Sequence, residues 1–142
     1  MDMHMERPDL SATRRQVDDL LARDSVVRLL GIRIDTATAD AVRLSWKPSP
    51  DLVNGHGLLH GGLVFLLADT ALAYLCAASG RSVVTRSAEV VFVAPGVGGA
   101  FVAEARFRNV SGRTVICDVQ IVRSDGVVCA EFRGQARVIE NI

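Results

Sequence analysis

Residues 63–78 read LVFLLADTALAYLCAA, and this stretch decides the fold because it is apolar on every face of a helix. A helix of that kind must be packed inside protein. Its one charged residue, Asp69, lies near the middle, where burial of a carboxylate is costly without a partner. Buried titratable groups are enriched in active sites, so Asp69 is the candidate catalytic residue. The alternative is a structural pair to an arginine or a polar network across an interface.

Segments with strand-like patterns flank this helix on both sides. They cover residues 32–37, 41–47, 83–94, 100–110, 113–123 and 127–139, with glycine- and proline-rich turns at the junctions. In residues 114–121 apolar and polar side chains alternate, as in a half-buried antiparallel strand. The last three strands are expected to form a meander. A sheet with one apolar face and a helix that is apolar all round predict an α+β fold, in which a curved antiparallel sheet wraps around the helix.

Two more helices are predicted before the first strand. Apolar residues recur at helical spacing from Leu10, which predicts an amphipathic N-terminal helix. A short second helix over residues 26–30 is expected to be capped by Asp24 or Ser25 and ended by Gly31.

The composition indicates one domain over residues 1–142, with residues 1–8 expected to form a disordered tail. The 16 basic and 16 acidic residues balance, so no global field favours nucleic acid or a membrane. The N-terminal segment lacks the order of a secretory signal, and the apolar helix is shorter than the roughly 20 residues of a membrane span, so we expect a cytoplasmic protein. The three cysteines are widely spaced, without a C-x-x-C pair or clustered histidines, and predict reduced core thiols and no metal site.

The residues in front of the apolar helix form a second candidate group, because residues 54–62 read NGHGLLHGG. The free amides of a first helical turn point outward at the positive end of the helix dipole, and glycines let a ligand approach the backbone. His60, Gly61 and Gly62 therefore predict an oxyanion site of the kind that stabilises acyl-transfer transition states. A glycine-rich helix start with a histidine satisfied by backbone is the alternative.

His60 and Asp69 cannot meet within one chain. Nine helical positions separate them by roughly 13 Å along the axis, and they point about half a turn apart. If both serve one reaction, a two-fold dimer must combine His60 and Gly62 of one chain with Asp69 of the other.

Three motifs resemble the signature of hotdog-fold acyl-CoA thioesterases, in particular the phenylacetate-degradation group. They are residues 53–56 (VNGH), residues 60–62 (HGG) and residues 67–71 (LADTA), and the likeness extends over almost the whole chain. The resemblance implies the hotdog fold and the hydrolysis of an acyl-CoA, either phenylacetyl-CoA or a hydroxylated form. It also implies homodimers with shared active sites, commonly paired into homotetramers, and no cofactor, because coenzyme A is part of the substrate.

The resemblance also implies a role for each matching residue. Asp69 would act as general base on water or as nucleophile on the thioester. The Gly62 amide would hold the thioester carbonyl, and His60 and Asn54 would orient that region or the water. A thioester is activated toward addition, so a carboxylate and one oxyanion donor can suffice without a metal or a serine triad.

Other matching residues are implied to position the reacting groups and the substrate. Thr85 falls where relatives place a hydroxyl that helps to position the nucleophile, although strand register could favour Ser87 instead. Arg113 resembles the family position that contacts coenzyme A phosphates, with Arg81 and Arg108 as weaker candidates. The implied substrate-binding residues are Gly61, Arg113, Thr114 and Phe65, within an acyl pocket that we expect to include Phe65, Leu66, Leu72 and Tyr74.

Two other functions compete with hydrolysis. A non-catalytic acyl-CoA-binding module, a sensor or carrier, is the alternative, although Asp69 is retained and no DNA-binding segment is appended. A hotdog hydratase would need a different disposition of Asp and His. The chain has no Gly-x-Ser-x-Gly elbow, which disfavours an α/β-hydrolase.

Overall fold

The computed structural model describes residues 10–142, and the expected tail of residues 1–8 lies outside the described residues. The elements follow one another as α1 (Leu10–Arg23), α2 (Ser25–Leu30), β1 (Arg33–Ala37), β2 (Ala41–Trp46), α3 (Gly61–Ala78), β3 (Arg81–Phe92), β4 (Phe101–Ser111), β5 (Thr114–Arg123) and β6 (Val128–Asn141). These bounds agree with the predicted segments to within about two residues at each end, the usual uncertainty of element ends. The helices and strands expected from the sequence are therefore confirmed.

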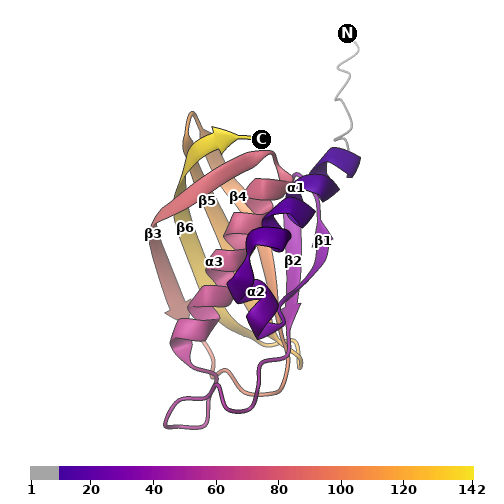
Figure 1. The fold of residues 1–142 in the computed structure, drawn as a ribbon. Coiled ribbons are helices and arrows are strands. Elements are labelled where there is room, and N and C mark those ends of the chain that lie inside the picture. Colours follow the sequence, from indigo (N-terminus) through magenta and orange to yellow (C-terminus); the bar gives the residue numbers. More distant parts are fainter. Residues whose placement is uncertain (1–9) are drawn as a thin grey trace.

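The six strands form one sheet in the order β1-β2-β4-β5-β6-β3, and neighbouring strands are antiparallel. Strands β4, β5 and β6 are the expected meander. The sheet curves around α3, which crosses its inner face (Figure 1). This is the hotdog arrangement, and β1 and β3 are its two edge strands. Strand β3 follows α3 directly in the chain but pairs with β6 at the edge of the sheet. Helix α3 packs against β3, so it lies beside an edge strand.

Helix α3 provides more buried core residues than any other element of the described chain. Its side chains from Leu67 to Leu72 that face the sheet have almost no exposed surface, and strands β4, β5 and β6 cover them. A Cβ atom at Gly134 of β6 would lie 2.4 Å from Leu72 Cδ1, so only glycine lets the helix approach the sheet this closely. Helix α3 is also long and apolar enough to cross a membrane, but it is the core helix of this sheet.

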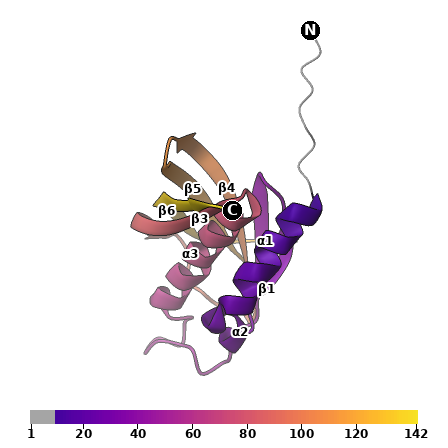
Figure 2. The same cartoon turned by 45° about the horizontal axis from the view of Figure 1, so that its top comes forward.

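Helix α1 packs on the side of α3 that the sheet leaves open, and α2 follows α1 and contacts it (Figure 2). Asp24 caps α2 by accepting a bond from the Val27 amide, and Gly31 ends it with a positive φ of 74°. The Tyr74 hydroxyl donates to Asp24 Oδ2 at 3.2 Å, and its burial, with Asp24 nearby, raises the pKa of Tyr74. Trp46 Nε1 donates to the Leu30 carbonyl at 2.8 Å. These bonds fix both helices against the core.

The three cysteines are free and buried, as the sequence predicts. The neighbouring Cys76 thiol and burial both raise the pKa of Cys117, and burial raises the pKa of Cys129. Since the thiolate is the reactive form, these two thiols are structural.

Candidate active site

Asp69 lies in the centre of α3 on the face that the sheet leaves partly open. Thr85 of β3 donates a hydrogen bond from Oγ1 to Asp69 Oδ1 at 2.7 Å. Among residues 10–142 no lysine, arginine or histidine forms an ion pair with Asp69. Asp69 therefore keeps its second carboxylate oxygen available, and the structural arginine pair proposed as an alternative is not formed among the described residues.

The register of β3 against β6 decides between Thr85 and Ser87. Thr85 pairs with Ala136, which is buried under α3, whereas Ser87 pairs with Gln135, which is exposed on the outer face. A bulge between Thr85 and Ser87 reverses the alternation at this point. Bulges often re-aim a side chain beside an active site. Thr85 consequently faces Asp69, and Ser87 points away from the helix.

At the start of α3, the free backbone amide is not the one that the sequence analysis predicted. His60 is the N-cap, and its Nδ1 accepts a hydrogen bond from the Gly62 amide at 3.0 Å. This leaves Nε2 to carry the proton of a neutral ring. Within the described residues the Gly61 amide has no hydrogen-bond partner. The amide that can receive a developing negative charge is therefore that of Gly61, whereas the sequence reasoning chose Gly62.

The rule for helix N-caps could have predicted from the sequence that the Gly61 amide is the free one. An N-cap side chain accepts from the second or third helical residue, so His60 at the N-cap predicts that Gly62, not Gly61, is occupied. Gly61 also has little room beside it, because an added Cβ would lie 3.3 Å from the ring of Phe92 at the end of β3.

Asn54 organises the loop that leads to the helix start. Its Oδ1 accepts from the amides of His56 and Leu58, and its own backbone pairs with Leu58 across the same turn. The His60 amide then donates to the Leu52 carbonyl at 3.2 Å. Asn54 thus orients the loop through its oxygen.

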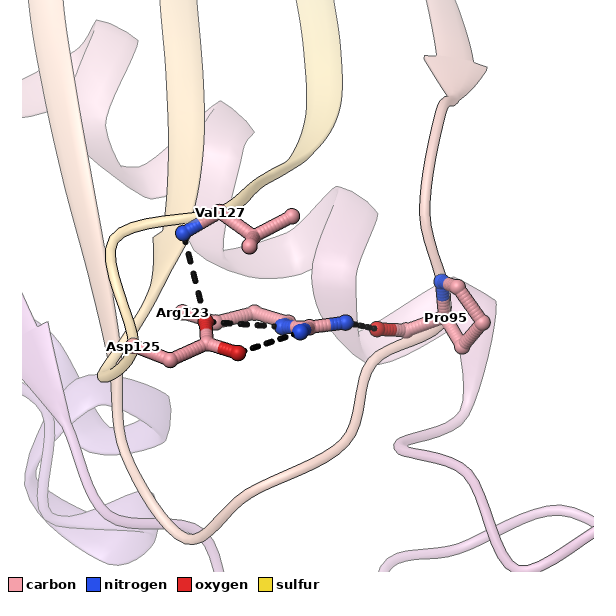
Figure 3. A network of polar contacts seen from close by, with 4 residues as sticks. All are labelled: Pro95, Arg123, Asp125 and Val127. Atoms are coloured by element: carbon pink, nitrogen blue, oxygen red, sulfur yellow. Dashed lines mark hydrogen bonds and ion pairs between the residues drawn. The ribbon is translucent and has the colours of Figure 1, made fainter.

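An arginine that the sequence reasoning did not select supports the same loop from the other side. Arg123 Nη1 donates to the Pro95 carbonyl at 3.1 Å, and its guanidinium forms a two-pronged pair with Asp125 (Figure 3). The next carbonyl, that of Gly96, accepts from the Leu59 amide at 3.0 Å. Arg123 therefore links the β5–β6 turn to the residue that precedes His60.

The predicted coenzyme A contacts have different surroundings. Arg113 lies in the turn before β5 rather than within the strand, and its guanidinium donates to the carbonyls of Val138 and Ile139 at the end of β6. Thr114 begins β5 beside it. Arg81 donates to Ser79 and lies over the Phe107 ring, and Arg108 pairs with Asp118. The structure does not bring these groups to Asp69 within one chain.

The expected acyl-pocket residues divide into two pairs. Phe65 and Leu66 are partly exposed, and the Phe65 ring packs edge-on against Phe132 at 5.4 Å. Leu72 and Tyr74 have no exposed surface, because both point into the core of their own chain. The expectation that Leu72 and Tyr74 line a pocket is therefore wrong for this chain.

The described residues form hollows large enough to bind a ligand. A hollow of about 710 Å³ lies on the sheet face that points away from α3, and its charged lining is remote from Thr85, which faces the helix. A smaller one of about 290 Å³ lies between α1, α3 and the start of β3, and neither Asp69 nor Thr85 lines it.

A sheet wrapped around an apolar helix is the hotdog fold, and among the described residues a carboxylate lies at the helix centre and a free amide at its start. Comparison with known proteins agrees. Residues 56–130 match the model of the thioesterase superfamily. The chain is 32% identical to the acyl-coenzyme A thioesterase PaaI of Escherichia coli over 82% of its own length and 84% of the relative. The chain therefore belongs to the thioesterase superfamily and is a thioester hydrolase, so the family expected from the motifs is confirmed.

Solved structures give the same picture. The PaaI protein of E. coli, described as part of the phenylacetic acid degradation operon, superposes with a TM-score of 0.87 at 28% identity, covering 93% of this chain and 96% of that one. A hypothetical thioesterase of Streptococcus pneumoniae, solved with coenzyme A, gives a TM-score of 0.74 at 19% identity, covering 78% and 90%. The second likeness shows the fold alone.

Proposed function

We propose that this protein hydrolyses an acyl-CoA thioester to the free acid and coenzyme A, with Asp69 as the catalytic carboxylate. The observation that carries the proposal is the Thr85–Asp69 hydrogen bond, which aims one carboxylate oxygen while the other stays available. As general base, Asp69 would take a proton from water as the water oxygen attacks the carbonyl carbon. The carbon–sulfur bond then breaks, and the thiolate of coenzyme A leaves and takes up a proton.

The carbonyl oxygen would be held by the Gly61 amide of a second chain. Gly61 stands at the positive end of the helix dipole, and its amide has no partner within residues 10–142. A preorganised amide aimed at a developing oxyanion is often the largest contribution to acyl transfer. His60 holds the neighbouring Gly62 amide, so it would keep the first turn in place rather than touch the reacting carbon.

The surface beside Asp69 supports an active homodimer. Strand β3 is a 12-residue edge strand with exposed Val84, Val91 and Phe92, and the open face of α3 adjoins it. A long apolar edge invites pairing with another strand. Two-fold pairing of this surface with a second copy would cover it and place each Asp69 against the partner helix. The tetramer and the cytoplasmic location remain predictions from the resemblance and the sequence.

An arylacetyl-CoA, phenylacetyl-CoA or its hydroxylated form, is the proposed substrate. This rests on the similarity to the E. coli PaaI protein of the phenylacetic acid degradation operon. The test is a panel of acyl-CoAs with detection of free thiol. Higher rates on long aliphatic chains than on phenylacetyl-CoA would contradict the assignment.

A subunit-complementation experiment tests the shared site. Asp69→Asn removes the carboxylate, and Gly61→Pro removes the backbone amide proton. Proline is well tolerated at the first position of a helix, and the extended backbone of His60 is compatible with a following proline. Each homodimer should be inactive. Because half of randomly mixed dimers are heterodimers with one intact site each, mixing should restore about a quarter of the wild-type rate.

The controls separate chemistry from folding. Gly61→Ala adds the same contact with Phe92 but keeps the amide, and it should retain most of the activity. Full activity of Gly61→Pro would refute the assignment of the oxyanion donor. If Asp69→Asn binds an acyl-CoA but wild type hydrolyses none, the protein is the binding module instead.

Hydrolysis in heavy-oxygen water separates the two roles of Asp69. In a single turnover, label in the enzyme carboxylate supports nucleophilic attack through an anhydride. Label found only in the product acid supports direct attack by water.

A further inference from the structure

Arg123 is the last residue of β5, and its side chain reaches the loop between β3 and β4. Nε and Nη2 pair with the Asp125 carboxylate, while Nη1 donates to the Pro95 carbonyl at 3.1 Å (Figure 3). Within the part of the chain that the structure describes, no other side chain forms a hydrogen bond with residues 93–100. Because the guanidinium is planar, its pairing with Asp125 also fixes the direction of the third nitrogen. The β5–β6 turn therefore holds the Pro95 carbonyl in place.

The Pro95 carbonyl in turn fixes the peptide unit that follows Gly96. Its oxygen also accepts a hydrogen bond from the Val97 amide at 2.9 Å. The Val97 N–H and the Gly96 C=O belong to one trans peptide unit, in which the two bonds point in opposite directions. With the Val97 N–H turned toward Pro95, the Gly96 oxygen is aimed the other way, at the Leu59 amide, which it reaches at 3.0 Å.

Leu59 passes this constraint to the start of α3. It precedes the N-cap His60, and it packs so closely on the loop that a Cβ atom at Gly96 would lie 3.2 Å from Leu59 Cβ. The His60 carbonyl accepts from the Leu63 amide at 2.9 Å, so the Gly61 N–H of the same peptide unit points out of the helix. The direction of the free amide therefore depends on how Leu59 and His60 enter the helix.

We propose that Arg123 is a positioning residue for thioester hydrolysis, because it sets the direction of the Gly61 amide through the β3–β4 loop. The inference rests on the proposed function and adds a residue that does not touch the substrate. An oxyanion donor is effective only when it is aimed at the developing charge from about 3 Å. Since this interaction is strongest in the transition state, a misaimed amide lowers kcat more than it weakens binding.

The kinetic test removes the guanidinium and keeps an apolar side chain. For Arg123→Met we expect kcat with phenylacetyl-CoA to fall about 5- to 30-fold, less than the roughly 10²- to 10³-fold loss on removing an oxyanion donor. KM and the affinity for a phenylacetyl thioether analogue should stay within about twofold. Arg133→Met is the matched control, because Arg133 forms a similar two-pronged pair with Asp118 on the sheet. It should leave kcat unchanged.

Amide NMR signals of glycine report the proposed linkage without any turnover. Isotope-labelled glycine gives a simple spectrum, because the chain contains 12 glycines, and Gly61→Ala assigns the Gly61 signal. The signals of Gly96 and Gly61 should both shift in Arg123→Met. The signal of Gly112, in the turn between β4 and β5, should not move. Arg133→Met should leave the signals of Gly96 and Gly61 at their wild-type positions.

Arg123→Lys is a second variant in case Arg123→Met does not fold. It keeps a positive charge beside Asp125, but an ammonium group is a single point of charge and does not span Asp125 and Pro95 as the planar guanidinium does. The shift of the Gly61 signal and the fall in kcat should therefore persist in a chain of nearly wild-type stability. A wild-type Gly61 signal and kcat in Arg123→Lys would overturn the proposal.

Subunit mixing tests which active site Arg123 serves. In the proposed dimer, Arg123 and Gly61 belong to the chain opposite the reacting Asp69. Mixing Arg123→Met with Asp69→Asn should therefore restore at least about a quarter of the wild-type rate, because each heterodimer has one intact site. A mixed rate of only about half the Arg123→Met value would place the effect on the Asp69 of the same chain and would contradict the proposal.

The two readouts separate this inference from the proposed function. If wild type hydrolyses no thioester but the Gly61 signal shifts in the Arg123 variants, the hydrolase proposal fails and the link from Arg123 to the Gly61 amide stands. If wild type hydrolyses thioesters but the Gly61 signal does not shift in these variants, the positioning role fails and the hydrolase proposal stands.

Discussion

The two faces of α3 are almost equally apolar in sequence, yet they serve different purposes. On the closed face, Leu67, Ala71 and Leu72 have no exposed surface and pack under the sheet. On the open face, Leu66 and Ala73 flank Asp69 and remain partly exposed within one chain. Hydrophobicity alone therefore does not separate core residues from recognition residues on a helix that is apolar all round. Only on the closed face does the folding of a single chain explain why the side chains are apolar.

The largest expected effect separates the two faces by stability. Leu72→Ala should lower the free energy of unfolding by about 2–5 kcal/mol, because it removes a fully buried side chain and leaves a cavity. Leu66→Ala is the matched change on the open face. Its effect should depend on protein concentration, since the Leu66 side chain would pack against the partner subunit in the proposed dimer.

Urea denaturation at two protein concentrations measures both variants. The destabilisation by Leu72→Ala should be the same at both concentrations after the wild-type value is subtracted. Equal, concentration-independent destabilisation by the two variants would show that the two faces do not differ in this way.

The next effect concerns catalysis on the open face. Thr85→Val keeps the shape of the side chain but removes the hydroxyl that donates to Asp69. A hydrogen bond to a charged group is worth about 1.5–3 kcal/mol, so kcat should fall by about 10- to 100-fold if the bond is needed in the transition state. KM for the acyl-CoA and the thermal midpoint should change little.

Two variants make the Thr85 experiment specific. Thr85→Ser restores the hydroxyl and should recover most of the rate. Ser87→Ala alters the hydroxyl on the outer face and should leave the rate unchanged. A rate loss in Ser87→Ala as large as that in Thr85→Val would contradict the register argument.

The sequence was sufficient for the architecture because each element carries a local signal. The apolar helix, the alternating strand of residues 114–121 and the glycine at position 31 each fix their own conformation. The family motifs also placed Asp69 and Thr85 among the candidates before their hydrogen bond was seen. Local pattern is a reliable guide where backbone propensity and burial point the same way.

The remaining details of the site depend on contacts between distant segments. A single-residue bulge decides whether Thr85 or Ser87 faces the helix, and no local pattern records it. The free amide of Gly61 follows from the capping geometry of His60 rather than from composition. Arg123 looks like an ordinary turn residue until its bond to Pro95 is seen across 28 positions. Such pairings are properties of the folded chain.

The smallest expected effect lies outside both faces of α3, in the turn that supports the loop before it. The bond from Arg123 lowers the pKa of Asp125 to about 2. A carboxylate whose folded pKa lies below its unfolded value stabilises the fold above the unfolded pKa, and this contribution is lost as the pH falls toward the folded value. Asp125→Asn should therefore be less stable than wild type near pH 7, and the difference should shrink between about pH 4 and pH 2.

Since Asp125 is exposed, the stability difference should be small and should shrink further in high salt. Urea midpoints of wild type and Asp125→Asn across that pH range measure it, with Asp40→Asn, an exposed aspartate without an ion pair in the described chain, as control. A constant difference from pH 7 to pH 2 would refute the linkage. Arg123, with only 14% of its side chain exposed, also holds Pro95 and through Gly96 the residue before His60. A fall in kcat for Asp125→Asn that is larger than its small loss of folding stability can explain would therefore connect this turn to the start of α3.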